Sequence, residues 1–296
     1  MILLFGAGGQ LGRELIRASA ARGMPLVALS RAEADIADAG AVRSAISRHE
    51  PSVVVNAAAY TKVDAAETES EAARQGNEIG PAVLAAASAA ADLPLVHIST
   101  DYVFDGNKDA AYVEDDPIAP INAYGRSKAA GERAVRQAAA KHVILRTSWV
   151  YGEFGQNFLK TMLKLAVTRD ELRVVADQRG CPTSTADLAA AILSIAPRLA
   201  ANENVWGTYH YAGSGVTTWH GFASRIVAAQ TPLTGRAPRV TAIPTSAFPT
   251  PSRRPANSVL DCGKFARVFG FRGQPWTEET DRITRALLSA EERHVA

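Results

Sequence analysis

Short, predominantly apolar runs alternate with longer segments of mixed polarity along the first half of the chain. The runs lie at residues 2–5, 26–29, 53–55, 95–98 and 143–145. Continuous apolar runs of this length predict strands that are covered on both faces, as in a parallel sheet. The segments between them have the length and pattern of helices. This alternation predicts an α/β protein built on a doubly wound parallel sheet.

The expected helices of this half lie at residues 13–22, 39–49 and 71–91, and a further one begins at Tyr124. The segment 71–91 contains Gly76, Gly80 and Pro81. Because proline lacks a backbone N–H and clashes with the preceding turn, we expect the first half of this helix to be irregular.

The pattern changes after Tyr151, where glycine and proline become more frequent and the apolar runs become shorter. Residues 1–150 are therefore expected to carry the sheet, and residues 151–296 to form mainly a smaller, less regular α/β lobe over its open end. Helical patterns recur in this second part at 158–168, 187–199, 219–230 and 277–290. The segment around 173–176 is expected to return to the main sheet as a strand.

Composition excludes several classes of protein. The 296 residues include 32 Lys and Arg against 30 Asp and Glu, a net charge of +2, and the basic residues are scattered, so nothing indicates a nucleic-acid partner. Cys181 and Cys262 lie far apart in sequence, which favours free thiols in a reducing compartment. The N-terminus lacks the basic flank of a signal peptide, and no apolar stretch is long enough to span a membrane. We therefore expect a cytoplasmic protein.

A glycine-rich turn, Gly6-Ala7-Gly8-Gly9-Gln10-Leu11-Gly12, joins the first strand to the first helix. Strand, glycine turn and helix in this order are typical of a dinucleotide-binding site in a Rossmann-like fold. Gly6 permits the tight turn, Gly9 lets the backbone approach a pyrophosphate, and Gly12 allows close packing. The N-terminus of the helix supplies free N–H groups for phosphates. Gln10 and Leu11 belong to the same predicted site.

The end of the second strand indicates which dinucleotide is preferred. An acidic residue at this position selects NAD, whereas an arginine accommodates the 2′-phosphate of NADP. Ser30 and Arg31 stand here, so the sequence favours NADPH and leaves NADH possible. Asp35 and Ile36, in the loop just beyond, are expected beside the adenine.

The third strand runs into Ala58, Ala59, Tyr60 and Thr61. Small residues at the carboxyl end of a strand leave room for a ligand in the crevice above the sheet. We therefore add these four residues to the predicted cofactor site.

Tyr124 and Lys128 are four residues apart on a predicted helix and so share one face. Two unit charges about 4 Å apart interact by about 4 kcal/mol at an effective dielectric of 20. At about 1.4 kcal/mol per unit, an ammonium could bring the pKa of a phenol from about 10 towards 7. The spacing alone also fits two neighbours on a solvated helix face.

Longer motifs narrow the range of protein families that the chain resembles. The chain resembles the extended short-chain dehydrogenases/reductases and, within them, the dTDP-4-dehydrorhamnose reductase family. The resemblance runs nearly end to end and rests on the glycine turn and on six further motifs. These are residues 55–64 (VNAAAYTKVD), 99–104 (STDYVF), 124–128 (YGRSK), 146–151 (RTSWVY), 177–183 (DQRGCPT) and 254–258 (RPANS).

The resemblance implies a reaction and roles for particular residues. It implies reduction of the C4 keto group of dTDP-4-dehydro-6-deoxy-L-mannose by NADPH, which gives dTDP-L-rhamnose. Tyr124 would give the proton to the carbonyl oxygen, and Lys128 would hold the nicotinamide ribose and stabilise the phenolate. Thr100 would hydrogen-bond the same oxygen, Asp101 would adjust the pKa values nearby, and Trp149 would lie against the sugar.

The family also raises the question of a metal and of a dimer. Some members hold Mg²⁺ between two subunits with glutamates. Glu14 fits one such position, Asp187 replaces another glutamate, and Glu291 or Glu292 would be the third acid. We predict no catalytic metal and leave an interfacial Mg²⁺ and a homodimer open.

Two other functions remain open from the sequence. An epimerase of nucleotide sugars uses the same tyrosine and lysine but retains its NAD. A non-catalytic regulatory subunit would keep the fold and the dinucleotide site without needing Thr100, Tyr124 and Lys128 together. A dehydratase is disfavoured because Asp101-Tyr102, and not an Asp-Glu pair, follows Thr100.

Overall fold

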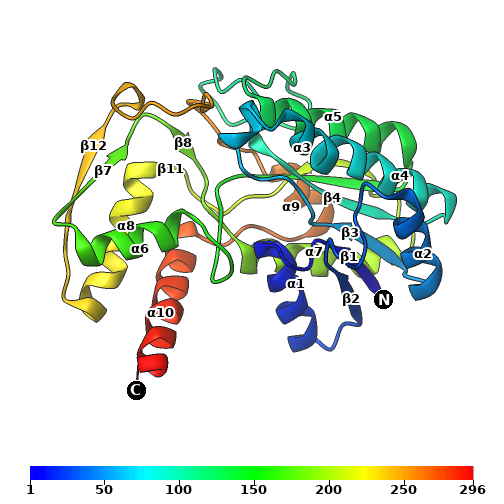
Figure 1. Cartoon of the computed structure of the whole chain (residues 1–296), viewed down its shortest axis with the longest axis horizontal. Helices are drawn as coiled ribbons and strands as arrows, with labels where there is room; N and C mark the ends of the chain where they lie inside the picture. The colour runs from blue at the N-terminus through cyan, green and yellow to red at the C-terminus, as the bar shows by residue number, and fades with distance from the viewer. Residues whose placement is uncertain (296) are drawn as a thin grey trace.

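Six parallel strands form the central sheet, and five of them are the predicted apolar runs (Figure 1). The computed structural model describes residues 1–295, and the side chains of residues 1–290. The strand order is β10-β5-β4-β3-β1-β2, and every neighbouring pair is parallel. The strands are β1 (Ile2–Phe5), β2 (Leu26–Leu29), β3 (Val53–Asn56), β4 (Leu95–Thr100), β5 (His142–Thr147) and β10 (Gly207–His210).

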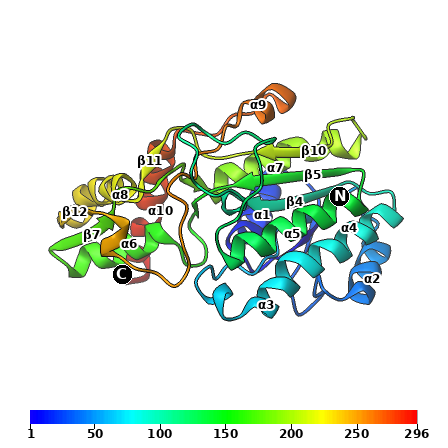
Figure 2. The ribbon, with the colours of Figure 1, turned by 90° about the horizontal axis from the view of Figure 1, so that it is seen from above.

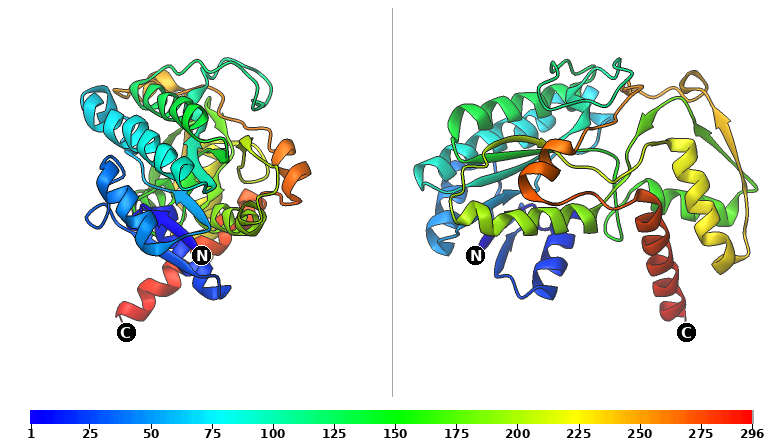
Figure 3. Two further views of the ribbon diagram at one scale, coloured as in Figure 1. Left: turned by 90° about the vertical axis from the view of Figure 1, so that its right-hand side faces the viewer. Right: turned by 180° about the vertical axis from the view of Figure 1, so that it is seen from behind.

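Helices cover both faces of the sheet, so the predicted doubly wound α/β class is confirmed (Figures 2 and 3). Each layer encloses its own apolar core against the strands. One face carries α1 (Gln10–Ala21) and α7 (Thr185–Ala200). The other carries α2 (Ala39–His49), α4 (Gly80–Ala90) and α5 (Ala123–Ala138).

The helix expected over 71–91 is irregular in its first half, as predicted. It consists of α3 (Ser70–Arg74), one π-helical turn (Gln75–Ile79) and α4. The π turn brings Asn77 beside the end of β3, where its side chain bonds both the N–H and the carbonyl of Tyr60 at 2.9 Å. A π turn inside a helix frequently marks a functional site, and this one orients a residue of the predicted crevice.

A second lobe packs beside the sheet around its own apolar core. It contains α6 (Phe158–Thr168), β7 (Glu171–Val175), α8 (Trp219–Thr234), β12 (Arg239–Ile243) and α10 (Trp276–Val295). Shorter elements complete this half of the chain. They are β6 (Val150–Tyr151) paired with β9 (Thr183–Ser184), β8 (Arg179–Gly180) paired with β11 (Thr217–Thr218), and α9 (Gly263–Phe269).

The strand expected to rejoin the main sheet around 173–176 does not do so. This strand, β7, pairs with β12 in a separate two-stranded sheet, and β10 is the late segment that extends the main sheet. The physical reason is visible in the burial pattern, because Glu171 and Arg173 are exposed while Leu172 and Val174 are buried. Such alternation suits a strand covered on one face only, whereas the central strands are covered on both.

Among the described residues, no helix is long and apolar enough to cross a membrane.

Candidate active site

A cavity of about 1350 Å³ opens above the carboxyl ends of the strands. The strand order reverses between β1 and β3, which is where parallel α/β sheets bind their ligands. The volume exceeds the several hundred Å³ typical of a site for one small ligand, so there is room for a dinucleotide and a second ligand. The predicted residues that line it are Gly6, Gly9, Gln10, Leu11, Ser30, Arg31, Asp35, Ile36, Ala58, Ala59, Tyr60, Thr61, Thr100, Asp101, Tyr124, Lys128 and Trp149.

The glycine turn forms one end of the cavity, and its shape fits a pyrophosphate. Gly6 has a φ of +97°, and a side chain here would strike the backbone of Ala58 on β3's trailing loop. A Cβ on Gly12 would clash with the carbonyl oxygen of Gly6, so Gly12 serves the turn itself and does not reach the cavity. No side chain caps the N-terminus of α1 at Gly9, which leaves its first N–H groups free for an anion.

The end of β2 carries the groups that face the adenosine part of a dinucleotide. The Arg31 side chain is 86% exposed and pairs with Asp35 at 2.9 Å. Glu33, which the sequence reasoning did not single out, accepts a 2.7 Å hydrogen bond from the backbone N–H of Ser30. Arg31 thus brings a cation to this end of the site, and the carboxylates of Glu33 and Asp35 accompany it.

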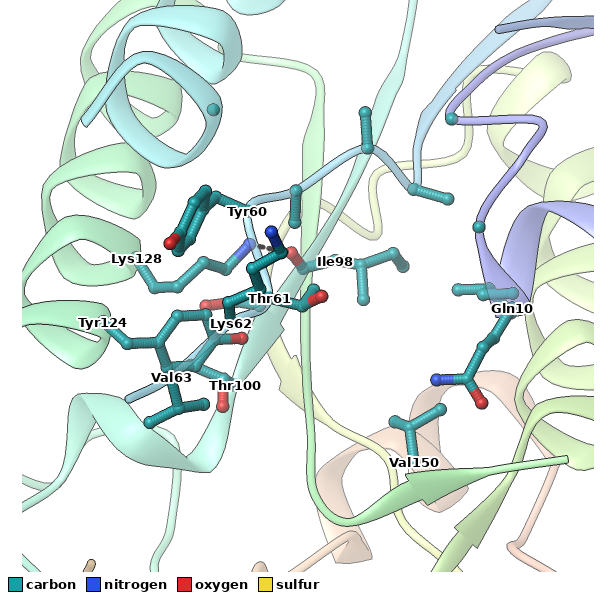
Figure 4. Close-up of a pocket in the computed structure, with 18 of the residues that line it drawn as sticks. Gln10, Tyr60, Thr61, Lys62, Val63, Ile98, Thr100, Tyr124, Lys128 and Val150 are labelled. Carbon is teal, nitrogen blue, oxygen red and sulfur yellow. Dashed lines mark hydrogen bonds between the residues drawn. The ribbon is translucent and has the colours of Figure 1, made fainter. Parts of the chain in front are cut away.

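Tyr124 and Lys128 both point into the cavity from the first two turns of α5 (Figure 4). Asn122 caps this helix through the N–H of Gly125 at 2.7 Å. The Lys128 ammonium is buried and donates a 2.6 Å hydrogen bond to the carbonyl oxygen of Ile98 on β4. The tertiary structure therefore fixes the ammonium at the floor of the cavity beside β4.

The expected lowering of the tyrosine pKa is wrong for this structure. Burial raises the pKa of Tyr124 above its usual value of 10, and the charge of Asp101 adds to the rise, while a hydrogen bond with Thr100 opposes it. Burial also lowers the pKa of Lys128 to about 8, against the influence of Glu132. Tyr124 is consequently a protonated phenol at neutral pH, which suits a proton donor.

Thr100 and Asp101 lie at the end of β4, beside the tyrosine. The Thr100 hydroxyl donates a 2.9 Å hydrogen bond to the Asp101 carboxylate and accepts one from the N–H of Tyr102. Burial raises the pKa of Asp101 to about 6, although hydroxyl groups of Ser258 and Thr100 lower it. A carboxyl group that titrates near neutrality next to a protonated phenol is typical of a site that moves protons.

A buried ion network lies directly beneath these residues. Glu132, one helical turn after Lys128, is fully buried and accepts two hydrogen bonds from Arg146 of β5, at 2.9 and 2.8 Å. It also accepts from Arg136 and from Ser99, each at 2.6 Å. The network joins β5 to α5, which carries Tyr124 and Lys128, and to β4, which ends at Thr100.

Trp149 is held in a strained conformation at the wall of the cavity. Its φ is +47°, which is unusual for a bulky residue and costs about 1–3 kcal/mol. Its ring stacks on Trp219 with centroids 3.7 Å apart, and Gly180 leaves the space that the ring needs. Strain of this kind persists only where neighbouring contacts support it, and it is concentrated at functional sites.

Several residues that line the cavity were not anticipated from the sequence. Trp219 begins α8 in the second lobe, where the sequence predicted only a helix over 219–230. Gly155 and Gln156 come from the loop after β6 and reach the glycine turn. No local signal marks these residues, because their position depends on how the second lobe packs against the sheet.

The acidic residues discussed for a metal are engaged within the chain. Glu14 is buried and pairs with Arg17 at 2.7 Å. Asp187 accepts hydrogen bonds from Tyr211 at 2.8 Å and from the N–H of Gln274 at 2.9 Å. Within residues 1–290 no group of three acids, histidines or cysteines could hold a metal ion. The side chains of Glu291 and Glu292 lie outside the described part of the chain.

Known proteins resemble the chain over almost its whole length. Residues 1–289 match the family model described as RmlD substrate binding domain. A dTDP-4-dehydrorhamnose reductase of Sinorhizobium fredii is 46% identical over 285 residues, which cover 96% of each chain. The crystal structure of a dTDP-4-dehydrorhamnose reductase from Clostridium acetobutylicum is 39% identical, with a TM-score of 0.89, and covers 97% of this chain and 99% of that one.

A further solved structure carries a bound dinucleotide. It is a dTDP-4-dehydrorhamnose reductase from Bacillus anthracis in complex with NADP, 36% identical, with a TM-score of 0.88 over 95% of this chain and 97% of that one. Family model, sequence relatives and folds thus agree with one another and with the motifs of the sequence. The chain belongs to the RmlD substrate-binding family, the family of the dTDP-4-dehydrorhamnose reductases.

Proposed function

We propose that the protein reduces the C4 keto group of dTDP-4-dehydro-6-deoxy-L-mannose to give dTDP-L-rhamnose, with NADPH as the reductant. The observation that carries this proposal is the phenol of Tyr124, which is partly buried and lines with Thr100 a cavity that begins at a dinucleotide-type glycine turn. The reductases that the chain matches along nearly all its length support the choice of sugar.

Reduction of a ketone adds a hydride to the carbonyl carbon and a proton to its oxygen. NADPH, when bound, supplies the hydride. Tyr124 holds the proton, because its raised pKa keeps the phenol neutral until the carbonyl oxygen becomes basic. The buried ammonium of Lys128 lies one turn along the same helix, where its charge favours the phenolate left after proton transfer. The hydroxyl of Thr100 and the carboxylate of Asp101 form a hydrogen-bonded pair at the end of β4, in the same cavity.

The reaction makes a direct test possible. Purified protein with dTDP-4-dehydro-6-deoxy-L-mannose should consume one NADPH per sugar, which absorbance at 340 nm measures, and should form dTDP-L-rhamnose, which NMR identifies. Turnover of a nucleotide sugar without net NADPH consumption would instead indicate an epimerase. Binding of NADPH with no turnover of any keto sugar would indicate a regulatory subunit.

We also propose that NADPH is preferred over NADH, and that Arg31 is responsible. In the same assay, Arg31→Glu should raise the KM for NADPH about tenfold or more, because it places a carboxylate where the 2′-phosphate needs a cation. The KM for NADH should change little, since NADH has no such phosphate. Equal changes in the KM for the two cofactors would show that Arg31 does not bind the 2′-phosphate.

Lys128 should set the alkaline limb of the pH profile. Its pKa is lowered to about 8, so the ammonium is present below pH 8 and lost above it. We expect kcat/KM to decline above about pH 8, since this parameter reports the free enzyme. Lys128→Arg keeps the charge and should remove this limb, although its absolute activity will be lower. A wild-type profile that stays flat to pH 9.5 would contradict this role of Lys128.

A further inference from the structure

The loop between β6 and α6, residues 152–157, belongs to the second lobe but lies against the glycine turn. Gly155 and Gln156 line the cavity beside Gln10, the first residue of α1. Gly155 has a φ of +65°, and a side chain at this position would strike Gln10. The loop and the turn are therefore fitted to each other at the phosphate end of the site.

Ion pairs and ring contacts hold this loop onto α1. Glu153 forms a bidentate pair with Arg17, at 2.7 and 3.1 Å. The Phe154 ring lies under the guanidinium groups of both Arg13 and Arg17, with centroid distances of 4.4 and 5.1 Å. The loop thus has a defined place relative to the turn, which a positioning role requires.

The hydrogen bonds of Asn157 have only one possible polarity. Its side-chain oxygen accepts from the backbone N–H of Lys160, which caps α6, and its amide nitrogen donates to the carbonyl oxygen of Gly152 at 2.9 Å. Both backbone partners have a chemically fixed role, so the Asn157 amide cannot be reversed. Its nitrogen also donates to Oε1 of Gln10 at 3.0 Å. Gln10 must therefore present its oxygen to Asn157.

The consequence concerns the other end of the Gln10 amide. With Oε1 engaged, the donor Nε2 is directed away from Asn157, and Figure 4 shows it facing the open middle of the cavity. This nitrogen has no hydrogen-bond partner among residues 1–290. The neighbouring part of the cavity is the glycine turn, where a pyrophosphate offers only acceptor oxygens.

We propose that Asn157 is a positioning residue for the dinucleotide: it fixes the Gln10 amide so that its N–H₂ group donates to the pyrophosphate. Asn157, the N-cap residue of α6 in the second lobe, thereby orients a hydrogen-bond donor on α1 in the first lobe. This proposal rests on the proposed NADPH-dependent function, which supplies the pyrophosphate.

The test is a double-mutant cycle on cofactor binding, measured by calorimetry with NADPH. Asn157→Ser keeps an oxygen to cap α6 but is too short to reach Gln10, and Gln10→Met keeps the length of the side chain without a donor. Each should raise the Kd for NADPH about 5–10-fold, the effect of one hydrogen bond. The double variant should be no weaker than the weaker single variant, because both changes remove the same interaction.

A second ligand separates positioning from general damage. Adenosine 2′-monophosphate has no pyrophosphate, so its affinity should be unchanged in Asn157→Ser. Asn107→Ser, which removes a similar exposed amide bonded to Asp105 and outside the cavity, is the matched control and should bind NADPH like the wild type. Additive losses in the double variant, unchanged NADPH affinity in Asn157→Ser, or an equal loss for adenosine 2′-monophosphate would each overturn the proposal. Wild-type protein that does not bind NADPH would instead overturn the proposed function.

Discussion

Replacement of Tyr124 by phenylalanine should lower kcat by about 10³-fold, within the 10²–10⁴-fold range of general acid catalysis. The change removes the hydroxyl group that we propose as the proton donor, whose raised pKa keeps it protonated. It keeps the ring, which packs edge-on against Tyr102 with centroids 5.5 Å apart. The Kd for NADPH should stay within a few-fold of the wild type, so the loss should lie in the chemical step.

Steady-state kinetics together with cofactor titration measure both quantities. Tyr209→Phe is a matched control, because its buried ring also loses a hydroxyl, one bonded to the carbonyl of Val205 at 2.8 Å, but it lies outside the cavity. Its kcat should be that of the wild type. If Tyr124→Phe kept kcat within tenfold, the proton would have to come from the Thr100–Asp101 pair, and the mechanism would be wrong.

Replacement of Glu132 by glutamine should reduce the free energy of unfolding by about 3–5 kcal/mol. The carboxylate is the shared partner of Arg146 and Arg136, and the guanidinium of Arg146 is 1% exposed. Without the carboxylate these cations stay in the protein with only neutral partners. For a chain of this length the loss corresponds to a fall in Tm of about 5–8 °C.

The pH dependence of the free energy of unfolding independently tests the contribution of the same network. Burial alone would raise the pKa of Glu132, but the hydrogen bonds and charge of Arg146 outweigh it and lower the pKa to about 2. A carboxyl group whose pKa falls on folding stabilises the protein above its unfolded pKa of 4.5. That contribution should disappear between about pH 4.5 and 2 in the wild type and be absent in Glu132→Gln.

Chemical denaturation at several pH values measures the effect. Asp170→Asn is the matched control, because its carboxylate is 97% exposed and pairs with Arg236 on the surface, where ion pairs add little. A variant Glu132→Gln as stable as this control would show that the buried pairs contribute no net stability. Should Glu132→Gln fail to fold, Ser99→Ala, which removes one 2.6 Å hydrogen bond to Glu132, should still show a loss of about 1 kcal/mol.

Local pattern predicted the sheet correctly where the strands are covered on both faces. Residues 2–5 and 53–55, for example, form β1 and β3, since every residue of each run is apolar and can be buried on either face of the sheet. The same reasoning misplaced the segment around 173–176, which belongs to β7, a strand of alternating exposure in a separate sheet. It did not identify 207–210 as the sixth strand, because this short strand mixes polar and apolar residues.

The sequence by itself determined the family, the glycine turn, and the identity of Thr100, Tyr124 and Lys128, because these depend on residue types at short, local spacings. Only the tertiary structure decided that the pKa of Tyr124 is raised, since the desolvation of the phenol and the nearness of Asp101 depend on how α5 packs against β4. It also decided that Asn157 meets Gln10, 147 residues away in the chain. Contacts between lobes depend on how separate cores pack together, and no local pattern in either segment records that arrangement.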